Sequence, residues 1–346
     1  MKKYFKTIGL IFIALITLES CVPTHKTAKD HVIIGFAGDV MIGRLVNKII
    51  KKKSYSYPWG NSLSLLAQAD LRIINLETTL TNCTKKTPKV FNFRALPDRV
   101  KTLQSAHIDI VNLANNHSLD FQEDGLAETI ATLDSAGIQH VGAGAHIHNA
   151  CKPVIITKKD IRIGIIGYTD NEPTWKASED KPGTNYIHIG DVHNIKNQIA
   201  ALRPLVDILI ITSHWGPNMQ QVPSPDFVEF AHTIIDSGAD IIHGHSSHVF
   251  QGIEIYKNKI IMYDTGDFVD DYAVDSELRN DQSFFFAVTV TKNGPISAAL
   301  TPVVIKNMQV NIADGAEKEE IINRMQQLSQ QFNTTITDDG IIDIQL

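Results

Sequence analysis

Acidic, amide and imidazole side chains repeatedly follow short apolar runs of this sequence. Asp39 closes the first run, Glu77 follows residues 71–76, and His214 follows residues 206–212. Carboxylates that lie close together repel one another, and a cation is the natural group to neutralise them. His245 and His248, which lie close together late in the chain, strengthen the pattern, because groups of histidines recur in metal sites. The sequence predicts one cluster that contains Asp39, Glu77, Asn116, His117, His214, His245 and His248.

The donor atoms of this cluster indicate which ions it would hold. Mixed oxygen and nitrogen donors suit Mn²⁺, Zn²⁺ or Fe better than Ca²⁺ or Mg²⁺ alone. One or two such divalent ions would lower the pKa of a bound water and make hydroxide available at neutral pH. Each residue has a structural alternative, since His214 could be a core histidine and Gly38-Asp39 a common turn. Their shared position after predicted strands is what favours a metal centre.

Alternating strands and helices must bring these residues together. In open α/β sheets, ligands bind where the carboxyl ends of the strands meet. A helix is predicted from Asp120, with Glu123 completing a capping box, to Gly137. Another helix is predicted between Ser224 and Gly238. The predicted strands of the α/β region span residues 32–37, 71–76, 108–113, 161–167, 206–212 and 241–242.

The composition indicates a globular α/β protein. The chain has 346 residues, of which 43% are hydrophobic and 20% charged. Its net charge of -6 argues against a nucleic-acid partner, because proteins that bind nucleic acids present basic surface to the phosphates. One α/β domain over residues 31–310, preceded by a tether at 21–30 and followed by a C-terminal helix and tail at 311–346, fits the pattern.

Residues 1–20 have the layout of a secretory signal peptide of the lipoprotein type. Three lysines precede the apolar stretch 8–18, which is too short to span a bilayer. The residues before Cys21 resemble a bacterial lipobox, so we expect an exported protein whose lipidated Cys21 anchors it to a membrane of the cell envelope. A cleaved signal without lipidation is the alternative. Cys83 and Cys151 then remain, and the sequence leaves open whether they pair.

Six motifs give the region from about Val32 to Tyr272 a resemblance to the bacterial CapA family, which is linked to poly-γ-glutamate biosynthesis. They are FAGDVMIGR (36–44), NLETTLT (75–81), NFRALP (92–97), LANNHSLDFQEDGLAETIATLDSAGIQHVGAG (113–144), SHWGPNM (213–219) and GADIIHGHSSHVFQGIEIY (238–256). The resemblance implies the fold of calcineurin-like metallophosphoesterases. That fold is a four-layer αββα sandwich of the α/β class, with a two-metal site at the strand ends.

The resemblance also implies roles for single residues. Asn75 lies in the second metal-binding motif, where a bridging carboxylate is expected. Asn116-His117 is similar to an Asn-His pair in which the Asn is a ligand and the His a general acid. The implied catalytic residues are His117 and Asp39, and the implied metal ligands are Asp39, Asn75, Glu77, Asn116, His214, His245 and His248.

The sequence departs from the family pattern at three places. Met41 stands where metallophosphoesterases usually carry the histidine of an Asp-x-His motif. Ser246-Ser247 separates two histidines where many relatives have His-Pro-His. Asp267 follows Gly266 where many relatives have Gly-Asn-Phe. One expected histidine ligand is therefore missing.

These features favour a metal-dependent hydrolase that acts outside the cytoplasmic membrane on a phosphoester, an amide or an anionic polymer. Arg44 could hold an anionic substrate, although it could equally be a salt-bridged helix residue. Asn171, Glu172 and Asp267 could shape the substrate pocket. The alternative is a non-catalytic accessory subunit that binds a nascent polymer or membrane synthase subunits, and the missing histidine at position 41 favours it modestly.

Overall fold

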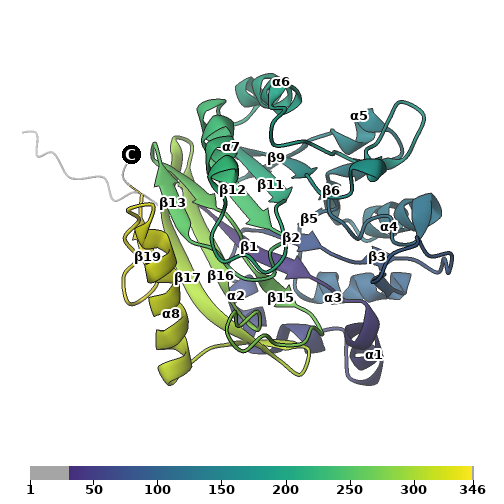
Figure 1. Cartoon of the computed structure of the whole chain (residues 1–346), viewed down its shortest axis with the longest axis horizontal. Coiled ribbons are helices and arrows are strands. Elements are labelled where there is room, and N and C mark those ends of the chain that lie inside the picture. Colours follow the sequence, from purple (N-terminus) through teal and green to yellow (C-terminus); the bar gives the residue numbers. More distant parts are fainter. Residues whose placement is uncertain (1–30, 345–346) are drawn as a thin grey trace, which may run out of the picture. The chain divides into compact units, whose positions relative to one another are not determined.

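Two β-sheets lie face to face at the centre of the described residues, which are 31–344 of this computed structural model (Figure 1). The expected signal peptide, Cys21 and the tether lie outside the described residues. The larger sheet has the order β18 (Gln309–Ile312), β17 (Gly294–Lys306), β16 (Gln282–Thr291), β1 (Val32–Val40), β2 (Leu71–Leu76), β5 (Ile110–Asn112) and β6 (Gln139–Val141), with β15 (Asp267–Val269) beside β1 and β19 (Ile341–Asp343) beside β17. The smaller sheet has the order β13 (Ile253–Tyr256), β14 (Lys259–Met262), β12 (Ile241–His245), β11 (Ile208–His214), β9 (Ile161–Thr169) and β8 (Val154–Lys158).

Parallel strands at the centre of each sheet bring polar residues to one edge. β1, β2, β5 and β6 run parallel to one another, and so do β9, β11, β12 and β14. Their carboxyl ends therefore meet, as the sequence predicts. Short strands pair nearby, β3 (Thr79–Leu80) with β4 (Arg94–Ala95) and β7 (Ala143–Gly144) with β10 (Gly183–Thr184).

Helices cover the two outer faces of the sheet pair. The face of the larger sheet packs against α1 (Arg44–Lys52), α2 (Leu63–Leu66), α3 (Val100–Ser105) and α4 (Gln122–Ser135). The face of the smaller sheet packs against α6 (His193–Leu202) and α7 (Pro225–Asp236). A short helix α5 (Ile147–Ala150) follows β7, and single 3₁₀ turns span Tyr57–Ser62, Pro97–Arg99, Pro173–Trp175 and Arg203–Leu205.

Three apolar clusters separate these layers. The cluster between the sheets joins Ile34 and Phe36 of β1 to Ile163 of β9 and Ile208 of β11, all of which are inaccessible to solvent. The other two clusters lie between each sheet and its helices. Strands that are buried on both faces must be apolar throughout, which explains why the predicted strands are continuous apolar runs. The layers confirm the predicted four-layer αββα sandwich.

Helix and strand boundaries differ from the predicted ones where the site begins. β11 and β12 extend to His214 and His245, so both histidines are the last residues of strands. α4 begins at Gln122, and the predicted capping box at Asp120 is wrong. The carboxylate of Asp120 accepts the backbone N–H of Phe93 instead, which leaves it unavailable to the helix.

The C-terminal residues belong to the same compact unit as the rest of the described chain. The expected boundary at residue 310 falls inside β18. The predicted C-terminal helix is α8 (Gly315–Gln330), whose Ile321 and Met325 join the core between the sheets, and β19 adds a strand to the expected tail. Within residues 31–344, no helix is long and apolar enough to cross a membrane, and Cys83 and Cys151 are free thiols.

Candidate metal centre

Strand pairing alone places five of the polar residues side by side, three in the larger sheet and two in the smaller. Asp39 on β1 is in register with Asn75 on β2 and with Asp267 on β15. In the smaller sheet, His214 on β11 is in register with His245 on β12. All five side chains are inaccessible to solvent. The two facing sheets therefore close a buried polar cluster at their common edge.

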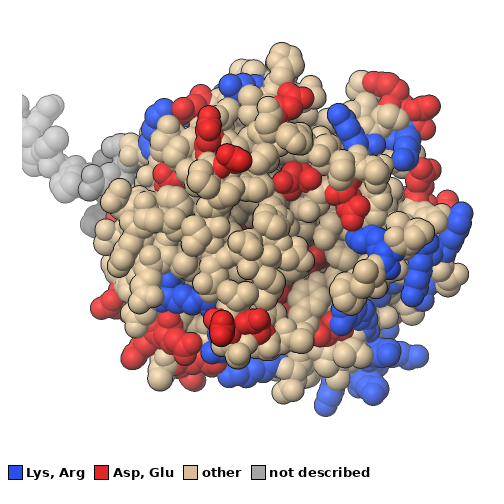
Figure 2. All heavy atoms as spheres, viewed as in Figure 1, with Lys and Arg blue, Asp and Glu red and all other residues tan. Residues whose placement is uncertain are grey.

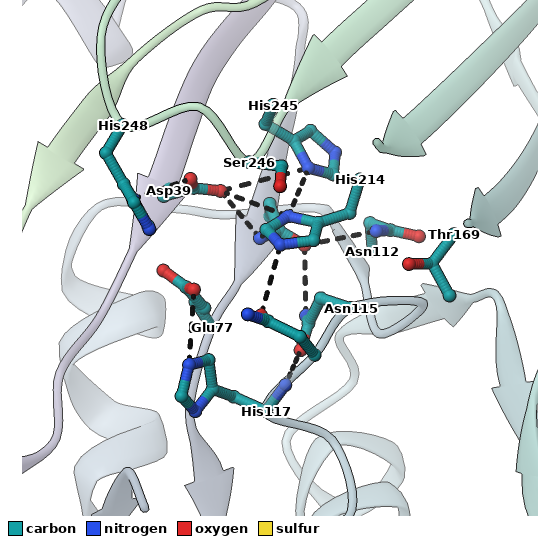
Figure 3. Close-up of polar contacts among 12 residues, drawn as sticks. Asp39, Glu77, Asn112, Asn115, His117, Thr169, His214, His245, Ser246 and His248 are labelled. Carbon is teal, nitrogen blue, oxygen red and sulfur yellow. Dashed lines mark hydrogen bonds and ion pairs between the residues drawn. The ribbon is translucent and has the colours of Figure 1, made fainter. Parts of the chain in front are cut away.

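Two groups of potential ligand atoms share the carboxylate of Asp39, and in each group all the atoms lie within 4.8 Å of one another. We call Asp39, His214 and His245 the imidazole subsite, and we call Asp39, Glu77, His248 and Asp267 the carboxylate subsite. Figure 3 shows Asp39 between His248 on one side and the His214–His245 pair on the other. Oδ1 of Asp39 lies 3.6 Å from Nδ1 of His214, and its Oδ2 lies 3.4 Å from Nδ1 of His248.

The donor atoms fit a cation. Within the described residues, Oδ2 of Asp39, Oε1 of Glu77 and Oδ2 of Asp267 are buried and have no hydrogen-bond partner. A buried carboxylate oxygen without a partner is costly, whereas a divalent ion would satisfy several at once. Oxygen and imidazole donors together are typical of transition-metal sites. The cluster therefore has the composition of a divalent metal site.

Burial and neighbouring charges set the protonation of this cluster. Burial alone would raise the pKa of Asp39, but the adjacent imidazoles of His214 and His248 hold that pKa well below its usual range. Burial, reinforced by the charge of Asp39, raises the pKa of Glu77 well above its usual range. Burial also raises the pKa of Asp267 well above its usual range, against the pull of His248. Cation binding must therefore displace protons from this cluster.

Buried amides hold the central carboxylate in place. Nδ2 of Asn75 donates to Oδ1 of Asp39 at 2.7 Å, and Oδ1 of Asn75 accepts hydrogen bonds from Asn112 and Asn115, each at 3.0 Å. The side-chain oxygen of Asn75 is therefore already occupied by two hydrogen bonds and is not available to a cation. Asn75, predicted as a ligand, lies in the cluster but positions Asp39 in this geometry.

Asn116 and His117 lie on the loop that follows β5. Oδ1 of Asn116 lies 3.1 Å from Nε2 of His214, the ring nitrogen that faces away from Asp39. A hydrogen bond there would leave the Nδ1 lone pair of His214 directed at Asp39. In this structure Asn116, predicted as a ligand, therefore orients the ring of His214 through Nε2, on the side away from Asp39.

His117 lies between two carboxylates. Its Nδ1 is 2.6 Å from Oδ2 of Asp120, and its Nε2 is 3.6 Å from Oε1 of Glu77 (Figure 3). The ring of Phe93 stacks on the imidazole at a centroid distance of 3.8 Å. Burial lowers the pKa of His117 to about 4, although Asp120 acts in the opposite direction. His117 is therefore a neutral imidazole at pH 7, with Nε2 facing the metal centre.

The predicted substrate residues have three different locations. The amide of Asn171 lies 3.3 Å from the carbonyl oxygen of His214, beside the imidazole subsite. Arg44 begins α1, forms an ion pair with Asp271 at 3.1 Å and lies outside both subsites. Glu172 lies 3.6 Å from Nζ of Lys89 and is also outside them. Asp267, predicted to contact substrate, lies among the candidate ligands instead.

Lys89 and Asp120 are site residues that the sequence analysis missed. Nζ of Lys89 contacts the carbonyl oxygen of Asn116, Oδ1 of Asp120 and the ring of Trp175. Lys89 therefore ties the segment after β3 to the loops after β5 and β9. Asp120 could have been found, because its spacing from His117 allows a contact. Lys89 carries no such signal, since it lies in an irregular segment far from its partners in the sequence.

The fold and the site define an α/β protein of the four-layer αββα class, with two facing sheets and a buried donor cluster at the strand ends. Within that class, the chain belongs to the family of the bacterial capsule synthesis protein PGA_cap, whose sequence profile matches residues 33–272. This confirms the family resemblance of the motifs.

Relatives and solved structures are similar over most of this chain. A Mycobacterium tuberculosis protein named "Probable polyglutamine synthesis accessory protein" is 34% identical over 91% of this chain and 87% of its own length. The Bacillus subtilis PGA biosynthesis protein CapA is 28% identical over 88% of this chain and 81% of its own length. Among solved structures, the sulfate thiohydrolase SoxB of Thermus thermophilus is 10% identical, with a TM-score of 0.44 over 86% of this chain and 48% of that chain.

Proposed function

We propose that this chain is an exported, lipid-anchored protein of the cell envelope that takes part in the synthesis of a surface polyanion similar to poly-γ-glutamate. We further propose that it is a metal-dependent hydrolase whose strand-end cluster holds one or two divalent ions. The names of its relatives support the biological role. The observation that carries the chemical proposal is the set of three buried carboxylate oxygens that lack partners among the described residues.

The residues of the cluster would have different roles in such a hydrolase. The two subsites would hold the metal, which would supply Lewis-acid polarisation of the substrate. His117 would exchange a proton with the reacting group at Nε2, while Asp120 holds the Nδ1 side of the ring. Phe93 and Tyr272 wall the site on the side of His117 and Glu77 and limit access of water.

An anionic substrate agrees with the charge around the site. The whole chain is acidic, yet Lys and Arg gather along the right side and at the lower right of Figure 2, where Figure 1 shows the segment after β3 and, below it, α1. Lys89 connects this edge to the loop that carries Asn116. This cluster of positive charge, which we call the basic edge, concentrates polyanions beside the site. The basic residues of α1 and this segment are Arg44, Lys48, Lys51, Lys52, Lys85, Lys86 and Lys89.

The chemical proposal is tested on full-length protein purified without chelator. We expect bound Mn, Zn or Fe by mass spectrometry and hydrolysis of para-nitrophenyl phosphate, its bis ester or γ-glutamyl para-nitroanilide. Replacing His214 and His245 together by Ala should abolish both properties, whereas the exposed His148→Ala should change neither. Substoichiometric metal, combined with no hydrolysis after metal is added back, would overturn the proposal.

A non-catalytic accessory role is the second candidate. Position 41 holds a buried methionine in place of the usual histidine, and a relative is named as an accessory protein. In this case the protein would bind the polymer along its basic edge, with metal serving the fold. Full-length protein that binds metal and poly-γ-glutamate but hydrolyses none of the probes would establish this alternative.

A further inference from the structure

Met41 directly follows β1, and Asp267 is the first residue of the neighbouring strand β15. The side chain of Met41 is fully buried in the apolar cluster between the larger sheet and its helices. Its sulfur accepts the backbone N–H of Gly43 at 3.2 Å. Met41 therefore contributes nothing to the donor set, and the ligand that a histidine would supply must come from elsewhere.

Asp267 reaches the metal centre from β15. It is in parallel register with Asp39, and its Oδ1 lies 2.9 Å from Nδ1 of His248. Its Oδ2 is buried and has no hydrogen-bond partner among the described residues. This oxygen is therefore available to a cation, whereas Oδ1 holds His248.

The close approach of β15 to β1 depends on Gly38. A Cβ atom at position 38 would overlap the carbonyl oxygen of Gly266. That carbonyl accepts the backbone N–H of Asp39 at 3.0 Å. This close approach of the two backbones brings Asp267 beside Asp39. A residue that only borders the site would not need so close an approach.

Donor composition distinguishes the two subsites. The carboxylate subsite has three carboxylates and one imidazole, whereas the imidazole subsite has two imidazoles and one carboxylate. Oxygen-rich sets suit Mn²⁺, and imidazole-rich sets suit Zn²⁺. The difference between the subsites is set largely by Asp267, because an amide or an imidazole there would remove one of the three carboxylates.

We propose that Asp267 is a metal ligand that takes the place of the histidine missing at position 41, and that it makes the carboxylate subsite a Mn²⁺ site beside a Zn²⁺ site in the imidazole subsite. This inference rests on the metal binding in the proposed function but not on hydrolysis. It specifies which ion each half of the centre takes and which residue decides it.

The test uses full-length protein stripped of metal, loaded with one equivalent of Zn²⁺ and titrated with Mn²⁺, with free Mn²⁺ followed by electron paramagnetic resonance. Asp267→Asn keeps the size of the side chain and an acceptor for His248. We expect its Mn²⁺ affinity to fall by about tenfold or more, with Zn²⁺ retained. The control is Asp271→Asn, whose side chain is 1% exposed and pairs with Arg44 outside the subsites. This variant should bind Mn²⁺ as the unsubstituted protein does.

Thermal unfolding separates a ligand from a structural residue. Without metal, Asp267→Asn should melt at the same temperature as the unsubstituted protein or higher, because one buried carboxylate among three has been removed. With Mn²⁺ added, its rise in melting temperature should be smaller. Failure to fold, a lower melting temperature without metal, or unchanged Mn²⁺ affinity would each overturn the inference.

The outcomes for this inference and for the proposed function differ. Unsubstituted protein that binds both ions but hydrolyses nothing leaves this inference standing and overturns the hydrolase proposal. Unsubstituted protein that is active and binds metal, with Asp267→Asn identical to it, overturns only this inference. Two Zn²⁺ ions held so firmly that Mn²⁺ cannot enter either subsite would also overturn it.

Discussion

Oδ2 of Asp120 lies 2.6 Å from Nδ1 of His117 and also accepts the backbone N–H of Phe93. The side chain of Asp120 is inaccessible to solvent, and that of His117 is 7% exposed. A buried carboxylate in this position holds the proton of a neutral imidazole on Nδ1 and leaves the Nε2 lone pair facing Glu77. The pair therefore fixes both the orientation and the tautomer of the only imidazole that the proposed reaction uses for proton transfer.

Replacing Asp120 by Asn tests this role. The amide can donate to Nδ1 and so favours the tautomer with its proton on Nε2, which is wrong for accepting a proton there. We expect the rate of metal-dependent hydrolysis to fall by about a hundredfold, within the range of general acid–base catalysis. Metal content by mass spectrometry should be unchanged. The exposed Asp124→Asn is the control, and an active Asp120→Asn variant would refute the role.

The pKa of His117 predicts a pH dependence of stability. Burial lowers that pKa to about 4 in the folded protein, whereas an unfolded histidine has a pKa of about 6.5. The stabilisation by the neutral ring is complete above the unfolded value and is lost as the pH falls toward the folded value. Between pH 7 and pH 5 this lowers the free energy of unfolding by about 2 kcal/mol.

Urea unfolding in the presence of a chelator measures this effect. His117→Asn keeps a donor for Asp120 but does not titrate, so its stability should fall less than that of the unsubstituted protein between pH 7 and pH 5. The exposed His148→Asn should retain the full pH dependence. Equal losses in the His117→Asn variant and the unsubstituted protein would show that His117 does not carry this dependence.

The sequence predicted the layers of the fold because buried parallel strands need apolar residues on both faces. Six continuous apolar runs of this kind can be recognised in the sequence. It also predicted the meeting of Asp39, Glu77, His214, His245 and His248, since parallel strands deliver their carboxyl ends to one edge. These residues follow from local pattern and topology alone.

Other features of the site depend on contacts that no local pattern records. Asp267 lies beside Asp39 because an edge strand returns late in the chain to pair with β1. The role of Asp120 was mistaken because helix-capping residues and buried hydrogen-bond acceptors have the same chemistry. Lys89 was missed because irregular segments have no periodicity from which side-chain direction can be read.

Lys89 should stabilise the loops around the site. Its Nζ lies 3.2 Å from Oδ1 of the buried Asp120 and 3.6 Å from Glu172, and it contacts the carbonyl oxygen of Asn116. Lys89→Met keeps the aliphatic stem but leaves a buried acceptor unpaired, which costs about 1–3 kcal/mol. Urea unfolding should show this loss, and the exposed Lys86→Met on the same segment should not. A neutral Lys89→Met would mean that the segment is held by other contacts.

Gly38 should tolerate no larger residue, because the approach of two backbones leaves no space there. The Cβ atom of Gly38→Ala would overlap the carbonyl oxygen of Gly266, which cannot move without breaking its hydrogen bond to the N–H of Asp39. We expect a loss of about 1–3 kcal/mol or more in the free energy of unfolding, as for other overpacked cores. Because the strain falls between Asp39 and Asp267, Mn²⁺ affinity should fall with it. Gly190→Ala, whose Cβ would meet only the side chain of His188, should leave both quantities within error. A Gly38→Ala variant of unchanged stability would show that β15 can move away from β1.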